Sequence, residues 1–208
     1  MLACLITLVL AHTVQAESHP EVVVPTYHDK YSKFVAQLEA GKTEINYAEF
    51  RESFIDSEAF KAAPQQAPDL GTLRRQMREL IQKSKHTEVI EIAKKMLSID
   101  YTDMEAHKAL QQAYKILGDM PNSKKYHDIE FGLLNSIVKK GDGKTPQTAW
   151  PVVQVTEEYF ILQMIGAQVL NQSLISGGRL CDRMEVQTNK GKEVFYFEVS
   201  KAFEGYKK

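Results

Sequence analysis

The longest regular feature of this sequence is a helical periodicity that extends from Leu73 to Val138. Apolar residues recur there every three or four positions, a spacing that is typical of amphipathic helices with one buried face. Four successive segments carry the pattern, at Leu73, Met77, Leu80 and Ile81, at Val89, Ile92, Ala93, Met96 and Leu97, at Ala106, Leu110, Ala113, Tyr114 and Leu117, and at Tyr126, Ile129, Leu133, Leu134 and Ile137. Such helices must bury their apolar faces against one another, so the middle of the chain is predicted to form a helical layer.

Two aromatic-rich segments precede this layer. Their apolar positions are Tyr27, Tyr31, Phe34, Val35 and Leu38 in the first, which Gly41 is placed to end, and Tyr47, Phe50, Phe54 and Ile55 in the second. Both sets have helical spacing, and we expect the rings to form a buried face rather than a ligand cage. The stretch KAAPQQAPDL, residues 61–70, places two prolines among small and polar residues, which predicts a linker or an ordered loop.

The pattern changes after Gly141. Residues 123–140 are typical of a helix near its end, with two lysines favoured by the helix dipole and Gly141 as a left-handed cap. Residues 152–155 predict a strand, whereas residues 159–165 fit either a buried strand or a short helix that begins at residues 156–158. The segments 180–186 and 193–199 have the alternation or the aromatic and β-branched content of strands, and Asn189-Lys190-Gly191 supplies a turn, so a β-hairpin is predicted.

The stretch KKGDGKTP, residues 139–146, ends on the Gly-Lys-Thr triplet of phosphate-binding loops. The full motif needs a glycine five positions before the glycine of that triplet, and Val138 occupies this position. The motif also follows a strand and opens a helix, whereas this stretch ends a predicted helix and precedes Pro146. We therefore expect no nucleotide site and no other cofactor.

Charge and hydropathy restrict the function further. The 208 residues include 26 basic and 27 acidic ones, a net charge of −1 without a basic cluster, so we expect no nucleic-acid partner. Residues 2–10 are almost continuously apolar, and Val14-Gln15-Ala16 has the residue pattern of a cleavage site, which predicts a signal peptide that ends at Ala16. No apolar run reaches the roughly 20 residues of a membrane-spanning helix. We expect a periplasmic or secreted protein without a stable membrane anchor.

Residues 86–119 resemble part of the tetratricopeptide repeat family. The stretch HTEVIEIAKKMLSIDYTDMEAHKALQQAYKILGD matches the second helix of one repeat and the first helix of the next, at Val89, Ala93, Met96, Leu110, Tyr114 and Gly118-Asp119. Tyr101, His107, Ser123 and Glu130 depart from the pattern. The resemblance implies a single helix pair with a groove, not an extended solenoid.

Signatures of metal and nucleophile sites are absent. No HExxH, paired-cysteine or GxSxG motif occurs. Asp103 with His107, and His127 with Glu130, have the spacing of ordinary pairs on a helix surface, so we expect no metal site. Cys181 is the one cysteine that cleavage would leave, and we expect it to be a packing residue in a strand without a disulfide.

The weak candidates for catalysis are three carboxylates. Glu157 and Glu158 are adjacent, and Asp182 lies in the predicted hairpin. Neighbouring carboxylates in an apolar cleft raise one another's pKa, which suits general acid/base chemistry. The alternative is that Glu157 and Glu158 are acidic residues at the start of a helix or the end of a strand.

The C-terminal third also resembles a family. The stretches GDGKTPQTAWPVVQVTEEYF, NQSLI, CDRMEVQ and VFYFEV are similar to those of the DUF4919 family of uncharacterised exported bacterial proteins. This resemblance rests chiefly on residues 132–203, and it implies export and a bacterial source. It implies no activity and no catalytic residues.

The sequence therefore predicts an α+β fold, in which an N-terminal helical region with a tetratricopeptide-like helix pair packs against a small C-terminal antiparallel sheet. The predicted segments are a signal peptide (1–16), a leader with the first helices (17–70), a helical region (71–140) and a β-rich region (141–208). The function expected first is a non-enzymatic module that binds a protein or peptide. The alternative is a carboxylate-dependent hydrolase that acts on cell-envelope material.

Overall fold

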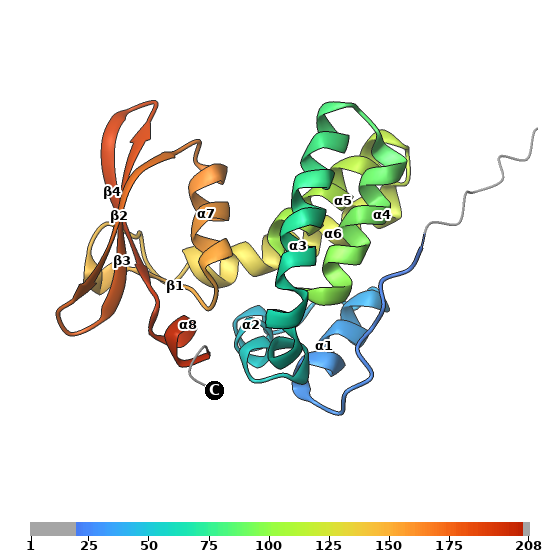
Figure 1. Cartoon of the computed structure of the whole chain (residues 1–208), viewed down its shortest axis with the longest axis horizontal. Helices are drawn as coiled ribbons and strands as arrows, with labels where there is room; N and C mark the ends of the chain where they lie inside the picture. The colour runs from blue at the N-terminus through green and yellow to red at the C-terminus, as the bar shows by residue number, and fades with distance from the viewer. Residues whose placement is uncertain (1–19, 206–208) are drawn as a thin grey trace, which may run out of the picture.

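The computed structural model describes residues 20–205, without the side chains of residues 63, 64 and 66–68. The predicted signal peptide lies outside the described residues. Figure 1 shows a helical part, α1 to α6, beside a four-stranded sheet, with α7 between the two. The α+β fold predicted from the sequence is confirmed.

The first two helices pack through the predicted aromatic residues. α1 (Lys30–Glu39) and α2 (Tyr47–Ile55) each begin at a residue whose side chain accepts a hydrogen bond from the first helical turn. The ring of Tyr31 lies 5.6 Å from that of Phe50 and 5.0 Å from that of Phe54, measured between centroids, and all three side chains are buried. These three rings form the core of the N-terminal part, as the sequence predicts. Tyr27 differs from the prediction, because it precedes α1 and is 46% exposed.

α3 (Glu58–Gln82) runs through residues 61–70, so the prediction of a linker there is wrong. A proline inside a helix removes one backbone hydrogen bond and crowds the preceding turn. Here the Ser57 side chain caps the helix by accepting a hydrogen bond from Phe60 N at 3.0 Å, and α3 packs along α4. Capping and tertiary packing outweigh the local cost of the two prolines. The helix also crosses residue 70, where a boundary was predicted.

The helical layer continues with α4 (His86–Ile99), α5 (Met104–Ile116) and α6 (Met120–Val138). Successive helices contact one another, α3 with α4, α4 with α5 and α5 with α6. Gly118 provides the turn between α5 and α6 with a φ of 84°, a conformation that glycine adopts without steric cost. The four helices predicted from periodicity are all present, and their apolar stripes face one another in the core.

The segment after α6 differs from its prediction at Gly141. This residue is not among the glycines with a positive φ, so it is not a left-handed cap, whereas Gly143 has a φ of 67°. A Cβ at Gly141 would lie 2.1 Å from the carbonyl oxygen of Thr148, and one at Gly143 would lie 2.7 Å from the Trp150 ring. Both glycines allow the turn around η1 (Pro146–Thr148) to pack closely. The Gly-Lys-Thr triplet thus belongs to a structural turn.

The sheet has the order β1-β4-β3-β2, and it is mixed rather than purely antiparallel. β1 (Trp150–Pro151) runs parallel to β4 (Gly191–Glu198), while β3 (Leu180–Thr188) is antiparallel to both β4 and β2 (Gln168–Ser176). β3 and β4 form the predicted hairpin, with Thr188 opposite Gly191. β2 is the edge strand on the side away from β1.

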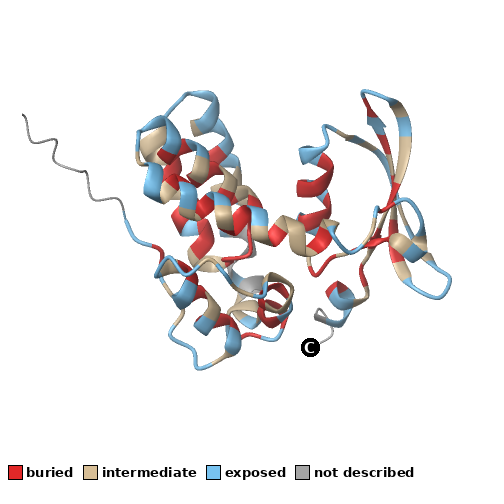
Figure 2. Ribbon diagram, turned by 180° about the vertical axis from the view of Figure 1, so that it is seen from behind, coloured by how far each residue is buried: buried red, intermediate tan, exposed pale blue. Residues whose placement is uncertain are grey.

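Residues 152–155 do not form the predicted strand. The strand at this place is β1, which ends at Pro151, and α7 (Val155–Met164) begins four residues later. α7 contacts both α5 and β2, so it is covered from two sides (Figure 1). Five of the ten residues of α7 are buried, and Figure 2 shows buried and exposed segments side by side along this helix. A short helix, α8 (Ser200–Gly205), follows β4.

Candidate functional site

The first turn of α7 is held by a buried ion pair with α2. Arg51 Nε lies 2.6 Å from Glu157 Oε1 and Arg51 Nη2 lies 2.7 Å from Glu157 Oε2, with side chains that are 4% and 3% exposed. Glu157 Oε2 also accepts a hydrogen bond from Val153 N at 2.8 Å, and Arg51 donates to the carbonyl of Pro151 at 3.0 Å. A carboxylate whose oxygens are occupied in this way holds structure and is not free to transfer a proton.

The next residue, Glu158, is fully buried and faces Asp182 of β3. Burial, and then the charge of Asp182, raise the pKa of Glu158 to about 9. As a carboxylate, Glu158 would have no hydrogen-bond donor at either oxygen. As an acid, its state at neutral pH, Glu158 donates to Asp182. Gln172 of β2 donates a second hydrogen bond to Asp182 Oδ2 at 2.5 Å.

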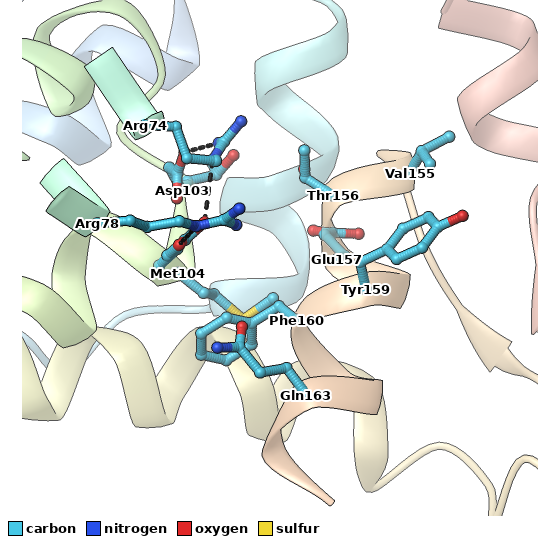
Figure 3. A pocket seen from close by; sticks show the side chains of 12 residues that line it. Arg74, Arg78, Asp103, Met104, Val155, Thr156, Glu157, Tyr159, Phe160 and Gln163 are labelled. Carbon is cyan, nitrogen blue, oxygen red and sulfur yellow. Dashed lines mark hydrogen bonds and ion pairs between the residues drawn. The ribbon is translucent and has the colours of Figure 1, made fainter. Parts of the chain in front are cut away.

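A cleft of about 260 Å³ lies between the helical layer and α7, and we call it the helical cleft. Figure 3 shows Arg74 and Arg78 on one side of it, and Tyr159, Phe160 and Gln163 on the other. The two arginines are paired with carboxylates that line the same cleft. Arg74 contacts Asp103 and also Glu105, at 3.0 Å, and Arg78 contacts Glu105 at 2.7 Å. The cleft therefore presents paired charges beside apolar and aromatic side chains.

A second hollow of about 440 Å³ lies over β2 and β3, and we call it the sheet groove. It is lined by Val155, Gln172, Leu174, Asp182, Val199, Ala202 and Phe203. Leu174 and Phe203 are 50% and 42% exposed, although both are large apolar side chains. Asp182 is the one charged residue among the lining residues, and it is 8% exposed.

The two hollows lie on either side of the start of α7. Val155, the first residue of α7, lines both of them and is 41% exposed. Tyr159, which lines the helical cleft, donates a hydrogen bond from its hydroxyl to Gln172 Oε1 at 2.9 Å, and Gln172 lines the sheet groove. A chain of hydrogen bonds therefore connects the helical cleft with the carboxyl pair of the sheet groove.

The relationship of this chain to known protein families follows from the residues that match one of them. Residues 27–208 match the family described as Domain of unknown function (DUF4919). The chain belongs to the DUF4919 family. Searches of curated proteins and of solved structures found no match. Membership agrees with the resemblance seen in the sequence and brings no activity with it.

In this DUF4919 protein the three predicted carboxylates have different surroundings. Glu158 and Asp182 are brought together across the interface of α7 and β3. Glu157 is instead locked by Arg51, and its place in the first turn of α7 agrees with the alternative of acidic residues at a helix start. Asp182 is the member of the set that lines the sheet groove.

Four residues with polar contacts at these sites were not predicted from the sequence: Arg51, Gln172, Arg74 and Arg78. Arg51 precedes Glu157 by 106 positions. Gln172 lies in β2, a strand that the pattern did not predict. Arg74 and Arg78 are one helical turn apart, and this spacing could have marked them as a basic pair on one face of α3. Only that last signal was present in the sequence.

The remaining sequence candidates have structural contacts. Asp103 caps α5 by accepting a hydrogen bond from Ala106 N at 3.1 Å, and His107 is buried rather than on a helix surface. Cys181 is buried in β3, as predicted. Among the described residues, no group of three or more histidine, cysteine or acidic side chains is placed to hold a metal ion. Nor does a helix within residues 20–205 have the length and hydropathy to cross a membrane.

Proposed function

We propose that this protein is a non-enzymatic binding module that holds a protein or peptide against the start of α7. The observation that supports this is the pair of hollows that share Val155. Both present exposed apolar or aromatic side chains, and a monomer rarely leaves such side chains grouped without a partner. An elongated ligand could lie across Val155 and contact both hollows.

The environment of the acidic residues favours binding over catalysis. Glu157 is held by Arg51, and Glu158 has no exposed surface. Glu157 lines the helical cleft, but both of its oxygens are engaged by Arg51. Asp182 lines the sheet groove, where no serine, cysteine, histidine or lysine lies beside it. A general acid or base must lie within hydrogen-bond reach of the substrate, and a fully buried Glu158 does not.

The place of action belongs to the same proposal. We propose an exported bacterial protein, cleaved after Ala16, whose α4–α5 pair is tetratricopeptide-like. The apolar N-terminal run and the cleavage-site pattern support export. Intact-mass measurement on fractionated cells tests it, because a mass for residues 17–208 in the periplasm or medium is expected. A full-length mass in the cytosol would remove the proposal of export.

Site-specific photocrosslinking tests the binding function. A photoreactive phenylalanine analogue at Val155 should form adducts with a protein or peptide in intact cells. The same residue at Lys83, an exposed position at the end of α3, is the control. Adducts at position 155 that are absent at position 83 are expected. If the two positions give the same products, or none, the binding function loses its support.

The second candidate is a carboxylate-dependent hydrolase, which the convergence of Glu158 and Asp182 favours. A protonated carboxyl group beside a second carboxyl group is an arrangement that some hydrolases use for acid/base chemistry. This candidate predicts turnover of cell-envelope polymers that Asp182→Asn abolishes. Release of fragments that is equal for the wild type, the variant and a buffer blank would remove it.

A further inference from the structure

The sheet groove contains a buried negative charge without a positive partner. Glu158 keeps its proton at neutral pH because burial raises its pKa, which leaves Asp182 as the carboxylate that faces the groove. Among the described residues, no lysine or arginine lines this groove. Two basic residues that are next to lining residues in the chain are paired elsewhere, Arg183 with Glu185 and Lys201 with Glu52.

A buried charge of this kind normally has a counter-charge. Burying an ionised group without a partner is costly, and such groups are usually paired or hydrogen-bonded to satisfaction. Asp182 receives neutral hydrogen bonds from Gln172 and from the Glu158 acid, and its position in the lining leaves it accessible from the groove. The groove is thus complementary to a cation that arrives from outside.

The walls of the groove determine what kind of cation fits. Leu174, Phe203 and Val155 present half-exposed apolar surface above the carboxyl group. A ligand that reaches Asp182 therefore needs an apolar stem as well as a positive end. Lysine has this combination, since its four methylene groups pack on apolar surface while the ammonium forms hydrogen bonds.

We propose that the sheet groove binds a lysine side chain of a peptide, with the stem along Leu174, Phe203 and Val155 and the ammonium at Asp182. This inference rests on the proposed peptide-binding function and names the side chain that is recognised. Arginine fits less well, because its planar fork favours two free carboxylate oxygens and Gln172 already occupies one of them. A peptide N-terminus would bring polar backbone groups down to the apolar walls.

Titrations of the ¹⁵N-labelled mature protein, followed by NMR, test the proposal with three probes. N-acetyl-lysine N-methylamide carries the ε-ammonium alone, N-acetyl-norleucine N-methylamide carries the same kind of stem without charge, and leucine N-methylamide carries an α-ammonium. We expect the lysine probe to shift the amide signals around Leu174 and Phe203 and to bind at least about tenfold more tightly than the other two. Equal affinities for the lysine and norleucine probes would overturn the proposal, and preference for the leucine probe would assign the groove to N-termini.

Variants provide the controls. Asp182→Asn should weaken the lysine probe at least about tenfold, while Glu44→Gln, which removes an exposed charge in the N-terminal part, should not. Leu174→Lys places a tethered ammonium at the groove wall, at a half-exposed position that tolerates it, and should block the probe as well. Unchanged binding in Leu174→Lys would contradict the assignment to this groove.

The C-terminal residues Tyr206, Lys207 and Lys208 follow α8 and carry two lysines of their own. A chain shortened after Gly205 lacks these lysines and shows whether they compete with a peptide ligand for the groove. The proposal expects the lysine probe to bind the full and the shortened chain alike. Binding that appears only after shortening would mean that the chain's own C-terminus occupies the groove. If crosslinking at Val155 fails while the lysine probe binds, the proposed function fails and the groove assignment remains. If crosslinking succeeds while the lysine probe does not bind, the proposed function remains and the groove assignment fails.

Discussion

Arg51 and Glu157 join the helical part of the molecule to α7 through two short contacts between oppositely charged groups, 2.6 and 2.7 Å long. The same arginine donates to Ser136 of α6 at 3.2 Å and to the carbonyl of Pro151 in β1 at 3.0 Å. One side chain of α2 therefore contacts three other elements, α6, β1 and α7. The position of α7, and with it the shape of both hollows, depends on this pair.

Arg51→Met should lower the free energy of unfolding by about 3–5 kcal/mol, because it leaves the Glu157 carboxylate buried without its partner. The double variant Arg51→Met with Glu157→Gln should lose less than the single one, since no buried charge remains. Lys30→Met is the matched control, because Lys30 pairs with Glu49 on the surface and such a pair contributes at most about 1 kcal/mol. Urea denaturation measures all three, and a double variant less stable than the single one would contradict this account.

The two helical environments on either side of the Arg51–Glu157 pair explain why part of the fold was predictable from the sequence and part was not. The helices of the layer each bury a single face, so their apolar residues recur with helical spacing. α7 lies between α5 and the sheet, and Phe160, Ile161 and Leu162 are buried one after another. A helix covered from two sides loses the periodic signal, which is why residues 159–165 fitted a strand equally well.

β2 was not predicted because too little of it is buried, whereas α7 is buried on two sides. It is an edge strand, and its side chains are mostly exposed or half-buried, so Gln168–Ser176 does not show the alternation of a half-buried strand. The candidate carboxylates were found because Glu157 and Glu158 are adjacent in the sequence. Their different roles depend on contacts with Arg51 and Asp182, which are distant in the sequence and come close only in the folded chain.

Glu158→Gln should stabilise the protein at alkaline pH. Burial and Asp182 raise the pKa of Glu158 from 4.5 to about 9, so the folded chain keeps this proton between those two pH values while the unfolded chain releases it. The free energy of unfolding therefore falls as the pH rises through this window. The glutamine variant has no proton to keep and should gain roughly 1–3 kcal/mol at pH 8 relative to the wild type. At pH 4 the gain should disappear.

Urea denaturation at several pH values between 4 and 9 checks this expectation. Glu44→Gln is again the control, and the difference between it and the wild type should not grow with pH. A Glu158→Gln protein that is less stable than the wild type at pH 8, by the same amount as at pH 4, would show that Glu158 is ionised in the folded state.

His107 should make the protein sensitive to acid. Its ring is fully buried, Nε2 donates a hydrogen bond to the carbonyl oxygen of Tyr101 at 2.8 Å, and Nδ1 has no partner. Burial lowers the pKa of His107 from 6.5 to about 4, so the folded chain binds fewer protons than the unfolded chain between these values. Stability is therefore lost as the pH falls through this window.

The variant His107→Gln tests the assignment, because its amide can donate to Tyr101 but cannot take up a proton. Its free energy of unfolding should be lower than that of the wild type at pH 7 by about 1–2 kcal/mol. Between pH 6.5 and 4 this free energy should fall less steeply than that of the wild type. His127→Gln, at an exposed position on α6, should keep the wild-type response. If His107→Gln loses stability as steeply in acid as the wild type, other groups cause the acid sensitivity.

Gly143 should be required for folding of the turn that carries the Gly-Lys-Thr triplet, and not for nucleotide binding. Alanine there must adopt a φ of 67° and place its Cβ 2.7 Å from the Trp150 ring, whereas at Gly118, with a φ of 84°, a Cβ meets no atom within 4 Å. Both variants incur the left-handed backbone cost of about 1–2 kcal/mol, and Gly143→Ala should lose roughly a further 1–3 kcal/mol through the clash. The difference between the two urea midpoints isolates the contact with Trp150.

ATP added to the wild-type protein should raise neither the urea midpoint nor the melting temperature, because Lys144 contacts Glu193 at 2.9 Å and lies over the Phe195 ring. Stabilisation by ATP that Lys144→Met removes would reinstate the triplet as a phosphate site.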